Sequence, residues 1–425
     1  MVQLSKPRVI IVGGGFGGLA CAKTLKNARF DVVLIDRTNH HVFQPLLYQV
    51  AVSALSPGDI GIPLRSILRN YHNTQVIMDE VQSVELSEHK LLLADGDLNY
   101  DYLVLAPGAR HSYFGNPQWE ELAPGLKSLR DAIHIRERML LSFETAERYY
   151  HTSDSKKYLT FVIVGGGPTG VELAGAIAEI GRKTLLPDYP ILSADDIRVI
   201  LIEAHERLLS SYSQKQSEYT LETLEKIGVE IILNTRVKTV LENKVITNND
   251  EEIETVNVIW AAGNKASPLI RTLGIEVNHS GCALVQPDLS VPGYPNVFVI
   301  GDAAHLIDVN GVEAPAVAPT AIQQGIYVAK LIKSRKIPSQ RKSFAYKDKG
   351  NMATIGRLKA VAMFGKLRFT GFTAWFMWCF IHILFLINFR NRLRVMVEWF
   401  WFYITRQPGA RLIVQKEMKM KEKEE

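Results

Sequence analysis

Cysteine is scarce in this chain, which has only Cys21, Cys282 and Cys379 among 425 residues. No C-x-x-C pair occurs, which argues against a disulfide framework, a structural zinc site and a thioredoxin-type dithiol. We therefore expect no metal centre, and a reducing cytoplasm as the compartment. The opening residues MVQLSKP lead directly into an apolar run, so we also expect no signal or transit peptide.

Acidic residues are nearly missing from one late segment. Residues 330–394 contain fifteen Lys and Arg but a single acid, Asp348, whereas the formal net charge of the whole chain is only +5. Basic charge confined to one segment predicts that this segment faces an anionic surface. The remaining composition, 47% hydrophobic and 22% charged, excludes a disordered chain and predicts two to three globular domains.

One supersecondary unit occurs twice. Each copy has a short apolar strand, a glycine-rich turn, a helix and a second apolar strand. The first copy covers strand 8–12, helix 16–26 and strand 31–35, and the second covers strand 159–164, a helix from 168 and strand 198–202. Segments 100–105 and 256–260 each precede a small-residue turn, so we expect them to be matching late strands of the two copies. A third strand, turn and helix follows at 297–300, 301–304 and 320–333.

The first glycine turn has the spacing of a dinucleotide-binding loop. Gly13, Gly15 and Gly18 fit G-x-G-x-x-G, in which the first glycine makes the turn, the second lets a pyrophosphate approach and the third packs helix on strand. Asp36 ends the next strand and is placed to accept a hydrogen bond from a ribose. A chance glycine turn is the alternative interpretation, but strand, helix and acid are all in place.

The second glycine turn repeats this pattern at Gly165, Gly167 and Gly170. Pro168 suits the first helical turn, where its missing N–H is not needed. Glu203 closes the following strand, and a carboxylate there accepts a free ribose 2′-hydroxyl but repels a 2′-phosphate. The sequence therefore favours NADH over NADPH, although Arg207 lies only four residues further on.

Two dinucleotide loops followed by a Gly301–Asp302 return are typical of a flavoprotein. FAD would occupy the first unit and NADH the second, with Asp302 near the ribityl or phosphate region of the flavin. A duplicated Rossmann fold with two NAD molecules is the alternative, and it leaves Gly301–Asp302 unexplained.

The chain resembles the type II NADH dehydrogenases, the single-subunit NADH:quinone oxidoreductases of the two-dinucleotide-binding-domain flavoproteins. The resemblance spans nearly the whole chain. It rests on GGGFGG at 13–18, HxFxPLLYQVA at 41–51, APGA at 106–109, GGGPTGVELAG at 165–175, WAAG at 260–263, GDAA at 301–304, a glutamine-bearing helix at 318–325 and DKGNMATIGR at 348–357.

Three catalytic roles are implied by this resemblance. Glu172 matches a glutamate near the nicotinamide that handles a proton, although a first-turn helix acid is the structural alternative. Gln323 matches the last glutamine of an A-Q-x-A-x-Q quinone motif, in which Pro319 here replaces the first glutamine. Lys349 matches a lysine near the isoalloxazine that stabilises reduced flavin, or it is one more surface cation.

Motifs and resemblance together predict three sets of binding residues. The FAD set is Gly13, Gly15, Phe16, Gly17, Gly18, Asp36, Arg37, Gln44, Val81, Ala106, Gly108, Gly301, Asp302, Ala321 and Lys349. The NADH set is Gly165, Gly167, Pro168, Thr169, Gly170, Glu172, Glu203, Ala262 and Gly263. The quinone set is Ala321, Gln323 and Gln324.

The segment 370–389 has no charged side chain and is long enough for a bilayer span. Both of its flanks are basic, however, and Trp375, Trp378, Trp399 and Trp401 cluster around it. We therefore expect a pair of helices that lie on an anionic membrane through residues 366–405, as the resemblance also implies. A buried oligomer interface is the alternative, and we expect no nucleic-acid partner.

The sequence thus predicts an α/β fold with two Rossmann-like domains and a C-terminal membrane-attachment segment. The predicted domains are 1–115 with 280–335 for FAD, 116–279 for NADH and 336–425 for attachment. The expected enzyme is a monotopic, FAD-dependent NADH:quinone oxidoreductase at the cytoplasmic face of the inner membrane. Its expected acceptor is menaquinone or ubiquinone, and we expect no proton pumping. A homodimer is a possible assembly. The alternatives are an NADH-dependent reductase of a ferredoxin or rubredoxin, and a non-enzymatic redox-sensing binder.

Overall fold

The computed structural model describes residues 6–152, 155–308, 311–405 and 410–413. Contacts divide the chain into two compact units, each built from three separate segments. The first unit consists of residues 1–42, 61–112 and 264–349, and the second consists of 43–60, 113–263 and 350–425. These units are defined by contacts, whereas the predicted domains are defined by the ligand each would hold, so the domain assignment stays a prediction.

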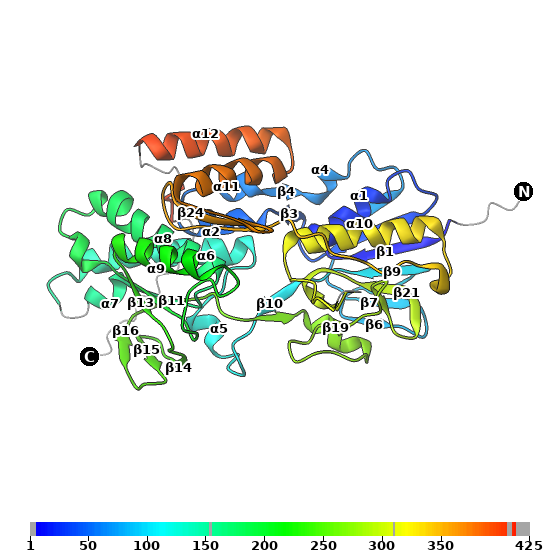
Figure 1. Ribbon diagram of the computed structural model, residues 1–425, viewed down its shortest axis with the longest axis horizontal. Coiled ribbons are helices and arrows are strands. Elements are labelled where there is room, and N and C mark those ends of the chain that lie inside the picture. The colour runs from blue at the N-terminus through cyan, green and yellow to red at the C-terminus, as the bar shows by residue number, and fades with distance from the viewer. Residues whose placement is uncertain (1–5, 153–154, 309–310, 406–409, 414–425) are drawn as a thin grey trace, which may run out of the picture. The chain divides into compact units, whose positions relative to one another are not determined.

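The first unit is built on a six-stranded sheet with helices against it (Figure 1). Its strand order is β20 (Ser290–Val291), β21 (Tyr294–Val299), β9 (Tyr102–Leu105), β1 (Arg8–Val12), β2 (Asp31–Asp36) and β5 (Thr74–Met78). All neighbours pair in parallel except β20 with β21. The inner strands β9, β1 and β2 are nearly continuous apolar runs because side chains on both faces of such a sheet are buried.

Helices α1 (Phe16–Thr24) and α10 (Ala318–Ser334) of this unit lie side by side, although they are far apart in the sequence (Figure 1). Glycine permits their close approach, because a Cβ at Gly325 would stand 2.1 Å from the carbonyl oxygen of Gly17. Smaller elements complete the unit: β3 (His40–Val42), β4 (Gly61–Pro63), α4 (Leu64–Ile67), β6 (Ser83–Glu85), β7 (Lys90–Leu93), β8 (Gly96–Asn99), β10 (Ala109–His111), β18 (Asn264–Ala266), β19 (Ala283–Leu284) and β22 (Ala304–His305).

The second unit contains a parallel four-stranded sheet of the same design. Its order is β13 (Val229–Ile232), β12 (Arg198–Ile202), β11 (Thr160–Val164) and β17 (Asn257–Trp260). As β9 and β2 flank β1 in the first unit, so β17 and β12 flank β11 here. The prediction that 100–105 and 256–260 are matching late strands is therefore confirmed.

Further elements surround this sheet. The helices are α2 (Leu47–Ala51), α3 (Pro57–Ile60), α5 (Trp119–Leu122), α6 (Leu129–Arg148), α7 (Ser155–Leu159), α8 (Pro168–Ile180) and α9 (Gln214–Lys226), and a small sheet is made by β14 (Val237–Val240), β15 (Lys244–Thr247) and β16 (Glu252–Glu254). The longest, α6, begins with a capping box in which Ser128 and Asp131 satisfy each other's backbone N–H groups.

The C-terminal part of the second unit is a three-stranded antiparallel sheet followed by two helices. The strands are β23 (Asn351–Thr354), β24 (Ala360–Phe364) and β25 (Leu367–Thr370), and the helices are α11 (Gly371–Phe385) and α12 (Phe389–Thr405). Ala360, Ala362 and Ala374 are fully buried, and these small side chains let α11 lie directly on β24. The uncharged run 370–389 thus forms α11 and the turn that leads to the first residue of α12. Among the described residues no helix combines the length and apolar character that crossing a bilayer requires.

Candidate active site

The first glycine loop is fixed by its own backbone. Gly13 has φ +101°, and a Cβ there would lie 2.2 Å from the carbonyl oxygen of Ala106, at the end of β9. A Cβ at Gly18 would lie 1.9 Å from the Gly13 oxygen, so strand and helix meet at van der Waals distance. Gly15, in contrast, faces open space and caps α1 without any side-chain hydrogen bond. The open approach at Gly15, at the N-terminus of α1, fits a dinucleotide pyrophosphate.

Asp36 holds this loop in place. Its Oδ2 accepts the Gly14 N–H at 2.6 Å, and its Oδ1 accepts the N–H and the hydroxyl of Thr38, each at 2.7 Å. The carboxylate is therefore an anchor of the glycine loop, a role that spacing alone did not indicate. Its predicted hydrogen bond to a ribose stays a prediction.

His41 is a second loop-holding residue, and sequence reasoning gave it no role although its motif was recognised. Its ring is 2% exposed, and Nδ1 lies 2.9 Å from the Gly14 carbonyl oxygen. Burial lowers the pKa of His41, which keeps the imidazole neutral with Nδ1 as the donor. Phe16 meets the same ring edge-on at 5.1 Å.

The second glycine loop repeats this arrangement. Gly165 has φ +110°, and a Cβ there would lie 2.9 Å from the amide nitrogen of Ala262. A Cβ at Gly170 would lie 1.8 Å from the Gly165 oxygen, whereas Gly167 faces open space. Glu203 corresponds to Asp36: its Oε2 accepts the Gly166 N–H, and its Oε1 accepts the His205 N–H at 2.8 Å. Two loops of the same internal geometry fit two dinucleotides.

The Gly301–Asp302 turn lies against α10, and its predicted place near the flavin stays a prediction. Gly301 has φ +71° and donates its N–H to Oε1 of Gln324 at 2.7 Å. A Cβ at Gly17 would be 3.1 Å from the carbonyl oxygen of Ala321, so α10 also reaches the glycine loop. Within the first unit, the two glycine-bearing turns and α10 thus form one cluster.

The two glutamines that were predicted to contact the quinone have different hydrogen-bond partners and different exposure. Gln324 is 1% exposed and is held by Gly301, whereas Gln323 is half-buried. Gln323 donates from Nε2 to the Lys347 carbonyl and accepts the Lys347 N–H at Oε1, both at 3.0 Å. It therefore fixes the segment that carries Lys349, whose side chain is exposed.

Gln44 is the one predicted FAD residue that lies in the second unit. Its Nε2 donates to the Lys127 carbonyl oxygen at 3.0 Å. The other predicted FAD and quinone residues all fall in the first unit, and every predicted NADH residue falls in the second.

Glu172 lies one residue beyond the first turn of α8. Its Oε1 accepts the Thr354 N–H at 3.4 Å, and burial raises its pKa to about 8. A helix N-terminus would lower the pKa of a carboxyl group, whereas burial raises it here, so the direction of the shift favours proton handling over the structural alternative of a first-turn helix acid. A group with a pKa near 8 can give and take a proton at physiological pH.

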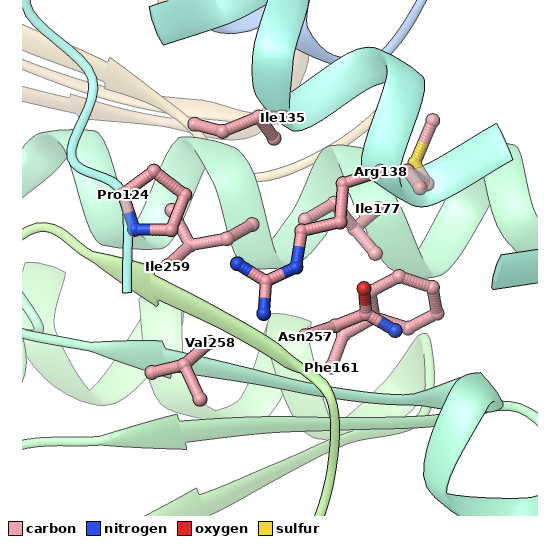
Figure 2. A pocket seen from close by; sticks show the side chains of 9 residues that line it. Pro124, Ile135, Arg138, Phe161, Ile177, Asn257, Val258 and Ile259 are labelled. Atoms are coloured by element: carbon pink, nitrogen blue, oxygen red, sulfur yellow. The ribbon is translucent and has the colours of Figure 1, made fainter. Parts of the chain in front are cut away.

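A small cavity beside β11 and β17 is not a substrate site. It measures about 10 Å³, which is at most the space of one water molecule. Figure 2 shows the Arg138 guanidinium reaching into it near Pro124, Ile259 and Asn257. Arg138 donates to the carbonyl oxygens of Leu122 at 2.8 Å and of Val256, so its role is structural.

Two family profiles together match almost the whole chain. Residues 7–325 match the pyridine nucleotide-disulphide oxidoreductases, and residues 349–407 match the NDH2 C-terminal domain. The type II NADH:quinone oxidoreductase Ndh of Mycobacterium tuberculosis is 42% identical, over 96% of this chain and 91% of that protein. NdhA of the same organism is 41% identical over 96% and 89%. The chain belongs to the type II NADH:quinone oxidoreductases.

Solved structures agree with this type II fold. NDH2 from Plasmodium falciparum in complex with NADH superposes with a TM-score of 0.88, over 96% of this chain and 100% of that one, at 22% identity. A sulfide:quinone oxidoreductase from Aquifex aeolicus reaches 0.69 over 96% of both chains at 18% identity, which shows a shared fold alone. The three cysteines of this type II enzyme, Cys21, Cys282 and Cys379, are free thiols in the structure.

Pro319 has a local structural explanation in this type II enzyme. It is the second residue of α10, within the first turn, where a missing N–H breaks no intrahelical hydrogen bond. A helix can therefore start normally without the family glutamine. Of the two polar groups expected to meet a quinone carbonyl, Gln323 remains.

Two glycines of the second loop differ in whether a Cβ would fit, and they give a pair of predictions. Gly170→Ala places a Cβ against backbone, so the loop must shift, and we expect the KM for NADH to rise at least about tenfold with FAD retained. Gly167→Ala meets no protein atom within 4 Å and should leave the melting temperature unchanged. Steady-state kinetics and thermal melts of both variants check this, and an unaltered KM in Gly170→Ala would contradict it.

Proposed function

We propose that this chain works at a membrane surface, where it oxidises NADH and reduces a quinone drawn from the lipid phase. Its activity is that of its family, FAD-dependent NADH:quinone oxidoreduction. The observation that carries the membrane part is the apolar surface of α11 and α12. The relatives at 42% and 41% identity are quinone reductases, which sets aside the ferredoxin or rubredoxin alternative.

The first glycine loop and the Gly301–Asp302 turn would hold FAD, with Ala321 and Gly325 keeping α10 close enough to complete the cradle. When bound, FAD would supply the redox chemistry that links NADH oxidation to quinone reduction. The residues that would hold its pyrophosphate are the open Gly15 and the N-terminus of α1. All FAD-binding assignments remain predictions, including those for Arg37, Gln44, Val81, Gly108 and Asp302.

The second glycine loop would hold NADH. Gly167 faces open space at the start of α8, so the nucleotide pyrophosphate can approach the helix N-terminus there. Glu203 stands at the end of β12, where its negative charge disfavours a 2′-phosphate and thereby NADPH. The pKa of Glu172, raised by burial to about 8, supports its assignment as the group that exchanges a proton during turnover.

The quinone would be bound near Gln323 and Ala321. An amide carries two N–H donors, and the Lys347 carbonyl takes one of those on Gln323, so the second can still meet a quinone oxygen. The buried Gln324 supports the Gly301 turn from behind. Lys349, in the segment fixed by Gln323, supplies positive charge for reduced flavin.

Helices α11 and α12 would attach the enzyme to the membrane. On α11, Phe372, Phe376 and Phe380 are each about 60% exposed and recur every four residues, which places them along one face. On α12, Phe400 and Ile404 are 68% and 65% exposed with the same spacing. Exposed aromatic stripes of this size mark an interaction surface.

The charge around these helices suits an anionic lipid surface. Lys366, Arg368, Arg390, Arg392 and Arg394 lie at their ends, where they could reach lipid headgroups. We assign attachment to the cytoplasmic face of the inner membrane, with menaquinone or ubiquinone as acceptor and without proton pumping. A homodimer stays a prediction that light scattering of the detergent-extracted enzyme would test.

An anaerobic visible titration tests this function. The detergent-extracted protein is titrated first with NADH and then with a menaquinone or ubiquinone analogue. We expect flavin absorbance to bleach with NADH and to return within seconds after quinone is added. Bleaching without recovery would leave FAD and NADH in place and overturn the quinone assignment.

A further inference from the structure

A chain of four hydrogen bonds runs from helix α12 to Glu172 within the second unit. The Trp399 indole donates to Oε1 of Gln49 at 2.7 Å, and Nε2 of Gln49 donates to the Tyr48 hydroxyl at 3.0 Å. The Tyr48 hydroxyl lies 2.9 Å from Oγ1 of Thr354, whose N–H reaches Oε1 of Glu172 at 3.4 Å. The four residues before Glu172 are each less than 10% exposed, so water does not compete for these bonds.

The indole sets the direction of this chain. An indole N–H can only donate, so Gln49 must turn its oxygen toward Trp399 and its NH₂ group toward Tyr48. The Tyr48 oxygen then accepts an N–H from Gln49, and in its bond with Oγ1 of Thr354 either hydroxyl can be the donor. The Trp399–Gln49, Gln49–Tyr48 and Thr354–Glu172 bonds thus have their donors on the side of α12 and their acceptors on the side of Glu172.

A second contact holds the same segment against α8. The Arg357 N–H donates to Oε2 of Glu179 at 2.8 Å, and the Arg357 side chain donates to the carbonyl oxygen of Tyr403 on α12. Gly175 keeps the two backbones close, because a Cβ there would lie 3.0 Å from the Gly356 nitrogen. The segment 354–357 is therefore hydrogen-bonded to Glu172 through Thr354 and to Glu179 through Arg357. Each of its two ends is also connected to α12, one through Tyr48 and Gln49 and the other through the Arg357 side chain.

Two titratable groups face Glu172 from the elements around it that the structure describes: Tyr48 from α2 and Tyr212 from the turn before α9. Burial raises the pKa of both phenols, so both are neutral where the enzyme works. The Thr354 N–H acts in the opposite direction to burial on Glu172, because it stabilises the carboxylate and lowers the pKa.

We propose that Tyr48 is a positioning residue for Glu172: its hydroxyl holds Thr354 where the Thr354 N–H reaches the carboxylate, and Gln49 and Trp399 make this placement depend on how α12 is seated. The inference rests on the proposed function, in which Glu172 exchanges a proton. It links the helix that would meet the membrane to the group that handles the proton. The 3.4 Å bond is the longest of the four, so a small movement of Thr354 suffices to break it.

The test is the pH profile of NADH:quinone turnover by the full-length enzyme with a short-chain quinone. Tyr48→Phe and Thr354→Val each remove the hydrogen bond that positions the Thr354 N–H toward Glu172. We therefore expect the apparent pKa of Glu172, read from the limb of the pH profile near pH 8, to rise by about half a unit to one unit. Trp399→Phe should shift it in the same direction by less. Tyr212→Phe removes a buried hydroxyl that also faces Glu172 but keeps the Tyr48–Thr354 bond, and its profile should match the wild type.

Several outcomes would overturn the proposal. FAD content and melting temperature show which variants fold. If one of Tyr48→Phe, Thr354→Val and Trp399→Phe does not fold, the other two still test the proposal. A limb that stays at the wild-type pH in the folded variants, or one that moves equally in Tyr212→Phe, excludes positioning by Tyr48 while leaving the role of Glu172 intact. A wild-type profile with no limb, together with unchanged turnover in Glu172→Gln, removes the proton-exchange function and this inference with it.

Discussion

Replacing Phe376, Phe380, Phe400 and Ile404 with serine should release the enzyme from anionic vesicles, with its FAD content unchanged. These side chains are about 60–70% exposed on α11 and α12 and make few contacts that the fold requires. Fully burying one large apolar side chain contributes about 1.5–3 kcal/mol, so even partial insertion of four amounts to several kcal/mol. We expect vesicle affinity to fall more than about a hundredfold in a sedimentation assay.

A control variant loses four exposed apolar side chains elsewhere on the chain. Ile191, Leu241, Ile307 and Val312 are also large, apolar and exposed, at 41–59%, and they lie outside the two helices. Their fourfold serine variant should bind vesicles like the wild type. Equal binding by both variants would show that α11 and α12 are not the attachment surface and would favour the alternative of an oligomer interface.

Deletion of residues 366–425 is a poorer test of the same idea. Trp378 is 1% exposed and Trp399 is 8% exposed, and their rings pack at 5.5 Å. Trp399 also hydrogen-bonds the buried Gln49. Deletion would therefore remove part of the core of the second unit, and we expect loss of folding. Surface substitutions separate attachment from stability.

Glu172→Gln should lower NADH:quinone turnover at pH 7 by about 10- to 100-fold with FAD still bound. The amide keeps the shape of the side chain and can still accept the Thr354 N–H, but it cannot exchange a proton. The limb of the pH profile near 8 should disappear with the carboxyl group. Stopped-flow and steady-state rates across pH 5.5–9.5 check this, and unchanged rates would return Glu172 to a structural role.

The same variant has a stability signature that does not depend on activity. Burial raises the pKa of Glu172 from 4.5 to about 8, so the folded wild type is stabilised relative to the unfolded chain only while this group is protonated. That stability is complete below pH 4.5 and is lost as the pH rises through 8. The melting temperature of Glu172→Gln minus that of the wild type should therefore widen from pH 5 to pH 9.

Glu179→Gln provides the control on the same helix. Burial also raises the pKa of Glu179, and its carboxylate accepts the Arg357 N–H. Its substitution should change stability with pH in the same sense but leave the turnover limb in place. Loss of the limb in both variants would show that it reports the packing of α8 rather than proton exchange by Glu172.

Local sequence was sufficient for the two nucleotide-binding units. Gly13 and Gly165 need positive φ, Gly18 and Gly170 need the absence of a Cβ, and apolar strands flank both turns. These requirements act over a few residues, so they can be recognised without a fold. The same reasoning found the late strands β9 and β17 and the helix α10.

Hydrogen-bond partners distant in sequence could not be found in that way. Glu172 meets Thr354 across 182 residues, and Trp399 meets Gln49 across 350. Spacing placed Asp36 and Glu203 correctly at the ends of their strands, but it did not show that each carboxylate holds the middle glycine of its loop.

The sequence by itself thus determined the family, the two dinucleotide units and the basic, aromatic C-terminal segment, because each depends on residue type and spacing. Only the tertiary structure decided that residues 370–389 form α11 and the turn before α12, and that the aromatic stripes of both helices remain exposed while Trp378 and Trp399 are buried. Only folding raised the pKa of Glu172, because burial and the approach of Thr354 exist only when α8, β23 and α2 come together. The proton affinity of a side chain belongs to its surroundings, and those are assembled from distant parts of the chain.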